Sequence, residues 1–453
     1  MKKILAGIIT FNALVLILFI LYLNDTGSVK LNVIAALLLA ISLIGMAIMR
    51  YSGRRVESFQ NVHLLVFSLV AFCIFLEILV FLPNLVPLQI RNYLDINNNN
   101  ATRGQVVEYL DRSPFAKFKP NVVVTSQGYR GPSTQFVYRW KTDKMGFKNL
   151  DEVLDNGKIE IVAVGDSFTE GMGVSIEDTW PSIITKCGRV TYNLGVQGYA
   201  PTQLEGSFRL YGCGLKPRYV VIGYCAGTYP REKTFLDKQS IVGQKRLTGG
   251  IDSIARADRR EIRKQSKHVS LAIYLFLADY SYSFKRDIAD RIKSKGVTNR
   301  LDKRYTCELL GVEHEKGDIS KISASPEYKQ ALNAFLGIKK LSGGIGSKVI
   351  FIYLPSRSYM YYEAGLGKKL PEDSFELVES RMLKDFCEKE GIAYLNPSGR
   401  ITGYVAALKD GASSDLYPYL EIDGHFSRRG NLLIAEEILS YLQSSENAAP
   451  KKR

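Results

Sequence analysis

Long apolar runs dominate the start of this chain of 453 residues. The first 90 residues hold three of them, Ile4–Leu23, Leu31–Met49 and Val62–Leu82. Each is close to the ~20 residues that an α-helix needs to cross a bilayer. We therefore expect three transmembrane helices within residues 1–88. We expect the first run to be retained rather than cleaved as a signal peptide, because no Ala-x-Ala site follows it.

Basic residues flank these runs unevenly. Lys2 and Lys3 precede the first run, and Arg50, Arg54 and Arg55 lie between the second and the third. Loops rich in Lys and Arg stay on the cytoplasmic side of a membrane. The pattern predicts a cytoplasmic N-terminus and a multi-pass protein of the cytoplasmic (inner) membrane. Everything after the third run would then lie on the outer side, which in a bacterium is the periplasm or the external membrane face.

From about residue 158 the pattern changes to short strand-like runs that alternate with helix-like segments. The strand-like runs are Ile159–Gly165, Val190–Val196, Tyr219–Tyr224, Lys348–Leu354 and Ile392–Leu395. The helix-like segments are Ile176–Cys187, Thr202–Tyr211, Pro326–Leu341, Ser374–Lys389 and Asn431–Leu442. Strands that alternate with amphipathic helices predict a parallel sheet covered on both faces. The continuous apolar run within Lys348–Leu354 predicts a strand buried on both faces.

Two segments do not follow this alternation. Residues 89–157 are a connector, in which Gln135–Trp140 and the following Lys141–Phe147 predict a hairpin. Residues 231–325 are an insertion with two basic clusters inside an α/β domain that we place at 158–445, before a basic tail at 446–453. One interpretation of the insertion is a helical hairpin with a solvated basic face. The other is a cap that contacts lipid headgroups or an anionic glycan.

The overall charge narrows the choice of partners. The chain has 60 Lys and Arg against 45 Asp and Glu, a net charge of +15, which suits nucleic acid, anionic lipid or an anionic polymer. The predicted outer location excludes nucleic acid and leaves membrane lipid or a polysaccharide. The six cysteines show no CxxC or metal-ligand spacing. One or two disulfides are compatible with an oxidising compartment, without any pairing being implied.

The first strand-like run ends in Gly165–Gly171, which reads Gly-Asp-Ser-Phe-Thr-Glu-Gly. A buried strand that breaks into a tight turn places Ser167 at the carboxyl end of the sheet, where α/β proteins bind their ligands. The plain alternative is a helix N-cap at Asp-Ser with no chemistry attached. A functional role for Ser167 is favoured over a plain helix cap if motifs with catalytic residue types also follow the other strands.

Such motifs are present, and together they resemble the sequence blocks of SGNH/GDSL esterases and acyltransferases. Gly165–Gly171 resembles block I, which implies that Ser167 is the nucleophile. Asn193–Tyr199 resembles block II, which implies that Gly198 offers its backbone N–H to an oxyanion, glycine permitting close backbone approach. Ile422–Gly430 resembles block V, which implies that His425 takes the Ser167 proton and that Asp423 orients the imidazole.

Two departures from the family pattern affect these assignments. The spacing in the last motif is Asp-x-His where many members have Asp-x-x-His, so Asp415 and Glu421 remain alternatives to Asp423. In the segment that resembles block III, Thr228 stands where the family has an asparagine. The resemblance implies that the Thr228 hydroxyl completes an oxyanion hole with the amides of Ser167 and Gly198. A slow enzyme, a different donor and a loss of catalysis all remain open.

The resemblance implies a flavodoxin-like SGNH three-layer α/β/α sandwich, preceded by a bundle of three transmembrane helices. It implies a serine esterase or O-acyltransferase without cofactor or metal. The implied substrates are O-acetyl esters of an envelope or exported polysaccharide first, and lipid acyl esters second. If the reaction is a transfer, a membrane-bound O-acyltransferase is the implied partner. The alternative is a non-catalytic module that binds a glycan or a lipid.

Overall fold

The computed structural model describes residues 106–110, 112–130, 133–155, 158–233, 301, 306–409, 412–421 and 423–447. The three predicted transmembrane runs and most of the basic insertion lie outside these residues. No helix within the described ranges is long and apolar enough to cross a membrane. The described residues all belong to one compact unit, formed by residues 102–258 and 282–453.

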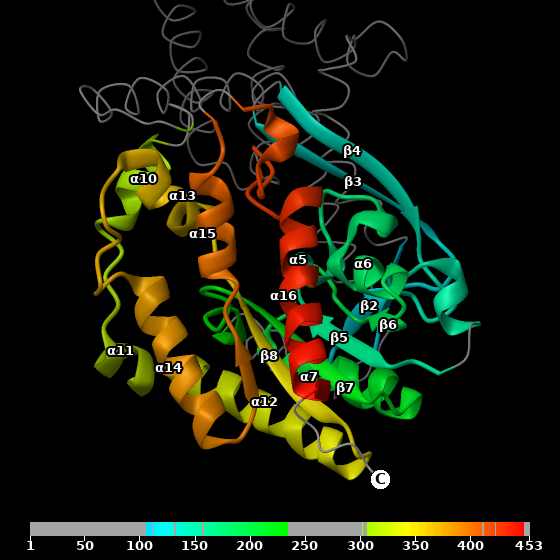
Figure 1. Ribbon diagram of the computed structural model, residues 1–453. Helices are drawn as coiled ribbons and strands as arrows, with labels where there is room; N and C mark the ends of the chain where they lie inside the picture. Colours follow the sequence, from blue (N-terminus) through cyan, green and yellow to red (C-terminus); the bar gives the residue numbers. More distant parts are fainter. Residues whose placement is uncertain are drawn as a thin grey trace, which may run out of the picture. The chain divides into compact units, whose positions relative to one another are not determined.

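Five parallel strands form the central sheet (Figure 1). They are β5 (Ile161–Gly165), β6 (Thr191–Asn193), β7 (Tyr219–Cys225), β8 (Lys348–Leu354) and β9 (Ala393–Leu395). Their order across the sheet is β6-β5-β7-β8-β9, and every neighbouring pair is parallel. Numbered along the chain this is 2-1-3-4-5, the order of flavodoxin-like sheets, which confirms the predicted α/β class. The winding reverses between β5 and β7, so a ligand crevice is expected at their carboxyl ends.

Helices cover both faces of the sheet, because alternate strand residues point to opposite sides. Val162 and Val164 of β5 belong to one buried cluster, and Ile161 and Ala163 belong to the other. The first cluster is shared with α7 (Pro201–Ser207), α11 (Ile319–Ala324), α12 (Pro326–Gly344) and α14 (Phe375–Lys389). The second is shared with α6 (Trp180–Lys186), α10 (Thr306–Val312), α13 (Arg357–Leu366), α15 (Ser398–Ala406) and α16 (Arg428–Asn447).

Two antiparallel hairpins precede the sheet. They pair β1 (Val107–Tyr109) with β2 (Ala116–Phe118), and β3 (Val123–Arg130) with β4 (Ser133–Lys141). The predicted hairpin was therefore wrong in its pairing, since β4 pairs with the strand before it and not with Lys141–Phe147. The segment after β4 is instead a turn closed by Asp143, whose carboxylate accepts the backbone N–H groups of Met145 and Phe147.

The short elements complete the chain. A four-residue helix, α5 (Ser167–Glu170), follows β5 directly. The remaining turns are 3-10 segments at Asp151–Leu154, Ile176–Asp178, Cys213–Leu215 and Ser414–Leu416, and a π-helical segment at Phe208–Gly212.

Most predicted elements are present, with two kinds of difference. Strand β8 has the predicted bounds, and its last five residues are buried. Strand β6 is shorter than predicted and ends at Asn193, although Leu194 and Val196 still donate backbone hydrogen bonds to Ala163 and Gly165 of β5. Helices α13 and α15 were not predicted. Cys187, Cys213, Cys225 and Cys387 are free thiols.

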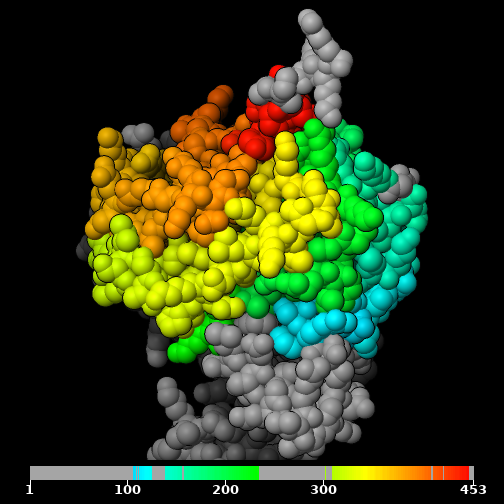
Figure 2. All heavy atoms as spheres, turned by 90° about the horizontal axis from the view of Figure 1, so that it is seen from below, coloured from blue at the N-terminus to red at the C-terminus, as the bar shows by residue number. Residues whose placement is uncertain are grey.

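The last helix, α16, packs beside α6 on the same face of the sheet. The Asn431 side chain accepts the backbone N–H of Trp180 at 3.0 Å, which joins α16 to α6. At the other end of α16, Glu446 forms ion pairs with Arg189 at 2.5 Å and Arg218 at 2.7 Å. Figure 2 views this end of the molecule, where the red C-terminal residues lie beside the green segment that leads into β7.

Candidate active site

Ser167, His425 and Asp423 form one hydrogen-bonded chain. The Ser167 hydroxyl oxygen lies 2.8 Å from Nε2 of His425. On the other side of the ring, Nδ1 of His425 contacts the Asp423 carboxylate. A carboxylate accepts hydrogen bonds only, so it fixes the imidazole proton on Nδ1 and leaves Nε2 to accept from Ser167. The structure brings together the three residues expected from the sequence, while Asp415 is exposed on a 3-10 turn.

Local structure holds the serine at the sheet edge. Asp166 caps α5 by accepting the backbone N–H of Phe168 at 3.0 Å. Ser167 is therefore the first residue of a helix that starts where β5 ends, and it is 3% exposed. The Phe168 ring lies 4.6 Å from the His425 ring between centroids, and 4.9 Å from Phe426. These ring contacts set the imidazole against the turn that carries the nucleophile.

The carboxylate of the chain stays ionised. Burial by itself raises the pKa of Asp423, but the hydrogen bonds from His425 and the electrostatic effects of His425 and Arg357 outweigh it and lower that pKa below its usual value. The guanidinium of Arg357 also donates to the carbonyl oxygens of Leu420 at 2.5 Å and Glu421 at 2.6 Å. Arg357 thus fixes the loop that carries both Asp423 and His425.

Two backbone amides near the serine point to no acceptor. Within the described ranges, neither the N–H of Ser167 nor that of Gly198 donates a hydrogen bond. Gly198 has a φ of +78°, and a Cβ added there would meet nothing within 4 Å. Glycine is therefore required for its left-handed backbone and not, as expected, for close approach. The close approach is at Gly195, where a Cβ would lie 2.3 Å from the Glu170 nitrogen.

The expected oxyanion role of Thr228 disagrees with the structure. Its side chain is 3% exposed, and its hydroxyl donates to the carbonyl oxygen of Cys225 at 2.5 Å. A hydroxyl has one proton to donate. Since that proton is already used inside its own turn, Thr228 is not placed to donate to an oxyanion.

We call residues 226–231, which follow β7, the β7 loop. Other polar groups of this loop also form hydrogen bonds within the protein. The backbone N–H of Gly227 donates to Glu379 at 2.9 Å, and that of Tyr229 donates to the Tyr224 hydroxyl at 3.2 Å. Burial raises the pKa of Glu379. At the end of the loop, the Arg231 guanidinium donates to the Asp166 carboxylate at 2.7 Å, so the β7 loop is tied to the residue before the nucleophile.

A buried lysine, Lys148, donates hydrogen bonds to the segment that follows α5. Lys148 is 0% exposed, and its ammonium donates to the carbonyl oxygens of Gly171 at 2.8 Å and Val174 at 2.7 Å. It also lies 4.5 Å from the Tyr138 ring centroid. Burial lowers the pKa of Lys148 to about 7, against the opposing effect of the nearby Glu170 carboxylate. The next residue, Asn149, exchanges hydrogen bonds with the Asn193 backbone at the end of β6.

Sequence reasoning assigned no role to four of these residues: Lys148, Arg231, Arg357 and Glu379. The sequence gives no signal for the first, because lysine is almost always a surface residue. The other three lie outside the recognised motifs or at their edges, and nothing in their neighbours marks them. Among the described residues, no group of His, Cys, Asp or Glu side chains is arranged to hold a metal ion.

Comparison with known proteins gives limited information. No protein-family profile matches the chain, and no curated protein sequence matches it. Similar solved structures include a putative acylhydrolase from Bacteroides fragilis, with 13% identity, coverage of 65% of this chain and 93% of that one, and a TM-score of 0.31. A putative lipolytic protein of the G-D-S-L family from Desulfitobacterium hafniense has 13% identity, coverage of 63% and 99%, and a TM-score of 0.30. An acetylxylan esterase from Geobacillus stearothermophilus has 12% identity, coverage of 63% and 94%, and a TM-score of 0.32. A likeness this weak does not specify an activity.

Proposed function

We propose that this chain is a serine-dependent esterase or O-acyltransferase of the SGNH type. The observation that carries the proposal is the hydrogen-bonded chain from Ser167 through His425 to Asp423. These three residues come from two distant segments of the sequence. A helix cap accounts for Asp166 and Ser167, but it does not explain why the His425 imidazole contacts the Ser167 hydroxyl or why the Asp423 carboxylate contacts that imidazole.

In the proposed reaction, Ser167 attacks the carbonyl carbon of an ester while His425 Nε2 takes the hydroxyl proton. The tetrahedral intermediate collapses, and His425 returns the proton to the oxygen of the departing alcohol. An acyl group then remains on Ser167. Water or an acceptor hydroxyl attacks this acyl-serine with His425 again as base, and the serine is regenerated. Asp423 accepts the Nδ1 hydrogen bond throughout and stabilises the imidazolium.

The negative oxygen of the tetrahedral intermediate requires donors. The amides of Ser167 and Gly198 are proposed for this role, since both are unused within the described residues. Thr228 is left out, because its hydroxyl donates to Cys225. Arg231 adds a positive charge beside the nucleophile turn through its ion pair with Asp166.

The proposed substrates are O-acetyl esters of an envelope or exported polysaccharide. Support for this comes from the resemblance to the family and from the predicted location at the outer face of the cytoplasmic membrane. A membrane-bound O-acyltransferase is the proposed acyl donor if the reaction is a transfer.

The catalytic proposal is tested with the purified full chain and 4-nitrophenyl acetate. We expect acetate release by the wild type, and loss of turnover in Ser167→Ala and His425→Ala with unchanged circular dichroism. Equal rates in wild type and Ser167→Ala would exclude the serine mechanism.

The proposed location has its own test. A reporter that is active only outside the cytoplasm, fused after Arg453, is expected to be active, and the same reporter fused near Ser52 is expected to be silent. The reverse pattern would contradict both the outer location and the exclusion of nucleic acid.

One observation favours a second candidate, a non-catalytic module that binds a glycan or a lipid. The Thr228 hydroxyl donates its proton to the Cys225 carbonyl oxygen, so the side-chain oxyanion donor that the family resemblance implies is missing here. Absence of turnover in every version of the chain, together with retained glycan binding, would favour this candidate.

A further inference from the structure

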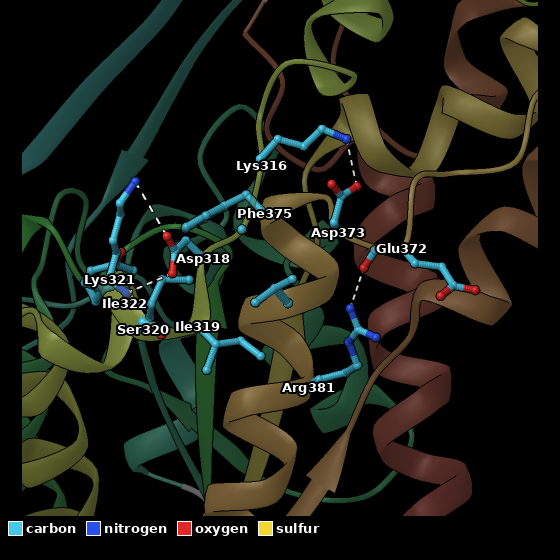
Figure 3. Close-up of a pocket in the computed structure, with 13 residues that line it drawn as sticks. Lys316, Asp318, Ile319, Ser320, Lys321, Ile322, Glu372, Asp373, Phe375 and Arg381 are labelled. Atoms are coloured by element: carbon cyan, nitrogen blue, oxygen red, sulfur yellow. Dashed lines mark hydrogen bonds and ion pairs between the residues drawn. The ribbon is translucent and has the colours of Figure 1, made fainter.

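An open pocket of about 890 Å³ lies beside α11 and the start of α14 (Figure 3). Its floor is apolar and includes Tyr229, Ile322, Phe375 and Val378. Its rim is exposed and mostly polar, apart from the exposed Ile319. It carries three basic and three acidic side chains: Lys316, Lys321, Arg381, Asp318, Glu372 and Asp373. None of these residues belongs to the Ser167, His425 and Asp423 chain.

The wall of the pocket is fixed by backbone hydrogen bonds. Gly317 donates to the carbonyl oxygen of Asp373 at 2.8 Å, and Phe375 donates to that of Glu315 at 2.8 Å. A Cβ at Gly317 would lie 2.5 Å from Val378, so glycine is needed for the segment to lie this close to α14. The pocket is therefore part of the folded architecture.

Two of the three basic side chains on the rim form ion pairs with acidic side chains of the rim. Figure 3 shows Lys316 directed at Asp373, 2.7 Å away, and Lys321 directed at Asp318, 3.5 Å away. The Arg381 guanidinium donates to the backbone carbonyl of Glu372. A ligand here meets both donors and acceptors around an apolar floor, with no excess of either charge.

The floor is continuous with the loop that reaches the nucleophile. Tyr229 belongs to the β7 loop, and its ring lies 6.4 Å from that of Phe375, with the two planes inclined by 32°. Arg231 is only two residues further on, so its Cα lies within about 7 Å of that of Tyr229. Its side chain reaches Asp166, the neighbour of Ser167. One short loop thus contacts both the pocket and the nucleophile turn.

We propose that this pocket binds a neutral sugar unit of the substrate, at a distance from the ester that Ser167 attacks. The proposal rests on the serine esterase or acyltransferase function proposed above. A pyranose ring has an apolar face of C–H groups, which fits the inclined Tyr229 and Phe375 rings, and a periphery of hydroxyls that both donate and accept. Specific small-molecule sites commonly combine an apolar floor with a few polar groups in this way. An anionic polymer would be expected on a rim with excess basic charge, and this rim has none.

The test uses the purified full chain and three neutral tetrasaccharides, cellotetraose, mannotetraose and chitotetraose, with binding measured by isothermal titration calorimetry. Ser320→Trp fills the pocket from its exposed rim on α11. Arg381→Ala removes one rim group, and Lys384→Ala, an exposed position one turn further along α14, is the matched control. Turnover of 4-nitrophenyl acetate shows whether each variant is folded and active.

We expect at least one tetrasaccharide to bind the wild type. We expect Ser320→Trp to weaken that binding about tenfold or more and Arg381→Ala to weaken it about threefold. Lys384→Ala should bind as the wild type does, and all variants should hydrolyse 4-nitrophenyl acetate within about twofold of it.

Absence of binding by all three sugars, or equal binding by wild type and Ser320→Trp, would overturn the proposal. Tighter binding of tetragalacturonate than of any neutral sugar would overturn the neutral class. A wild type that binds a sugar in a Ser320→Trp-sensitive way, yet hydrolyses no ester, would retain the pocket and reject the serine mechanism.

Discussion

The turn after β5 and the loop after β7 stand at the same edge of the sheet, yet they use their polar groups in opposite ways. The first leaves the Ser167 amide without an acceptor among the residues that the structure describes, and it directs the Ser167 hydroxyl at His425. In the second, the Gly227 amide, the Thr228 hydroxyl and the Arg231 guanidinium all have partners within the protein. Buried polar groups are normally paired, so the unpaired ones are the exceptions that need a reason.

Polar groups without a partner in the protein are available to a substrate, whereas paired groups maintain the shape of the site. The polar groups of the β7 loop are paired, so this loop has a structural role, although the family resemblance places an oxyanion donor at Thr228. The substitutions below, from the largest expected effect to the smallest, change one side or the other of this comparison.

The largest effect is expected at the far end of the catalytic chain. Asp423→Asn keeps the shape but presents an amide to His425 Nδ1, which favours the wrong tautomer. We expect a loss of about 10⁴-fold in kcat for ester hydrolysis. Asp415→Asn is the control, because Asp415 is exposed and makes no contact with His425 among the described residues. If kcat fell no further in Asp423→Asn than in Asp415→Asn, the carboxylate that orients His425 would have to be a different one.

The second change acts on an unpaired amide. Gly198→Ala introduces a Cβ at a φ of +78°, which strains the backbone and is expected to turn the N–H away from the oxyanion. Losing such a donor costs about 10²-fold or more in kcat. Gly346→Ala is a matched control, since Gly346 has a φ of +76° and also open space around it. A kcat that falls equally in both variants would show that only stability is affected.

The third change concerns the lysine beneath the nucleophile turn, which faces Glu170, Glu177 and Asp178. The pKa of Lys148 is lowered to about 7 in the folded chain, from 10.5 when unfolded. Between these values the unfolded chain binds more protons, so the free energy of unfolding rises with pH. From pH 7 to 9 the rise contributed by Lys148 is about 2 kcal/mol.

Lys148→Met should remove this contribution. Urea unfolding of the full chain at pH 7 and pH 9, followed by circular dichroism, measures the difference between wild type and variant. An unchanged pH dependence in Lys148→Met would mean that the lysine does not lose its proton in this range.

The smallest effect is expected from a substitution in the β7 loop. Thr228→Val removes the hydroxyl that donates to Cys225 and should lower the free energy of unfolding by about 1 kcal/mol. Because no oxyanion contact is lost, kcat should stay within about twofold of the wild type. A fall of 10²-fold or more would restore Thr228 as a donor and contradict the comparison.

The sequence predicts those parts of the fold that depend on strong periodic patterns. Strand β8 is continuously apolar because helices cover both of its faces, so its bounds could be found directly. Strand β3 could not, because Thr125, Ser126, Gln127 and Gly128 interrupt any apolar pattern. The same weakness caused the wrong partner to be chosen for β4.

For the site, short motifs identify groups whose chemistry is in the residue type, such as Ser167 and His425. They do not show how a hydroxyl is oriented. Whether Thr228 faces the oxyanion or its own Cys225 carbonyl depends on backbone dihedrals over three residues, which a motif does not contain. Burial of Lys148 is similarly invisible, since lysine is almost always a surface residue.

The distance along the chain between Ser167 and His425, 258 residues, has a consequence for when the proposed activity appears. Ribosomes deliver a chain from its N-terminus, so the nucleophile emerges long before its base. The loop that carries the base is held by Arg357 and continues directly into α16, which docks through Asn431 against the start of α6. A chain interrupted anywhere before residue 423 therefore carries a serine that cannot be activated. Premature or partly folded products are expected to be harmless to the esters around them, and ester cleavage marks the completion of folding.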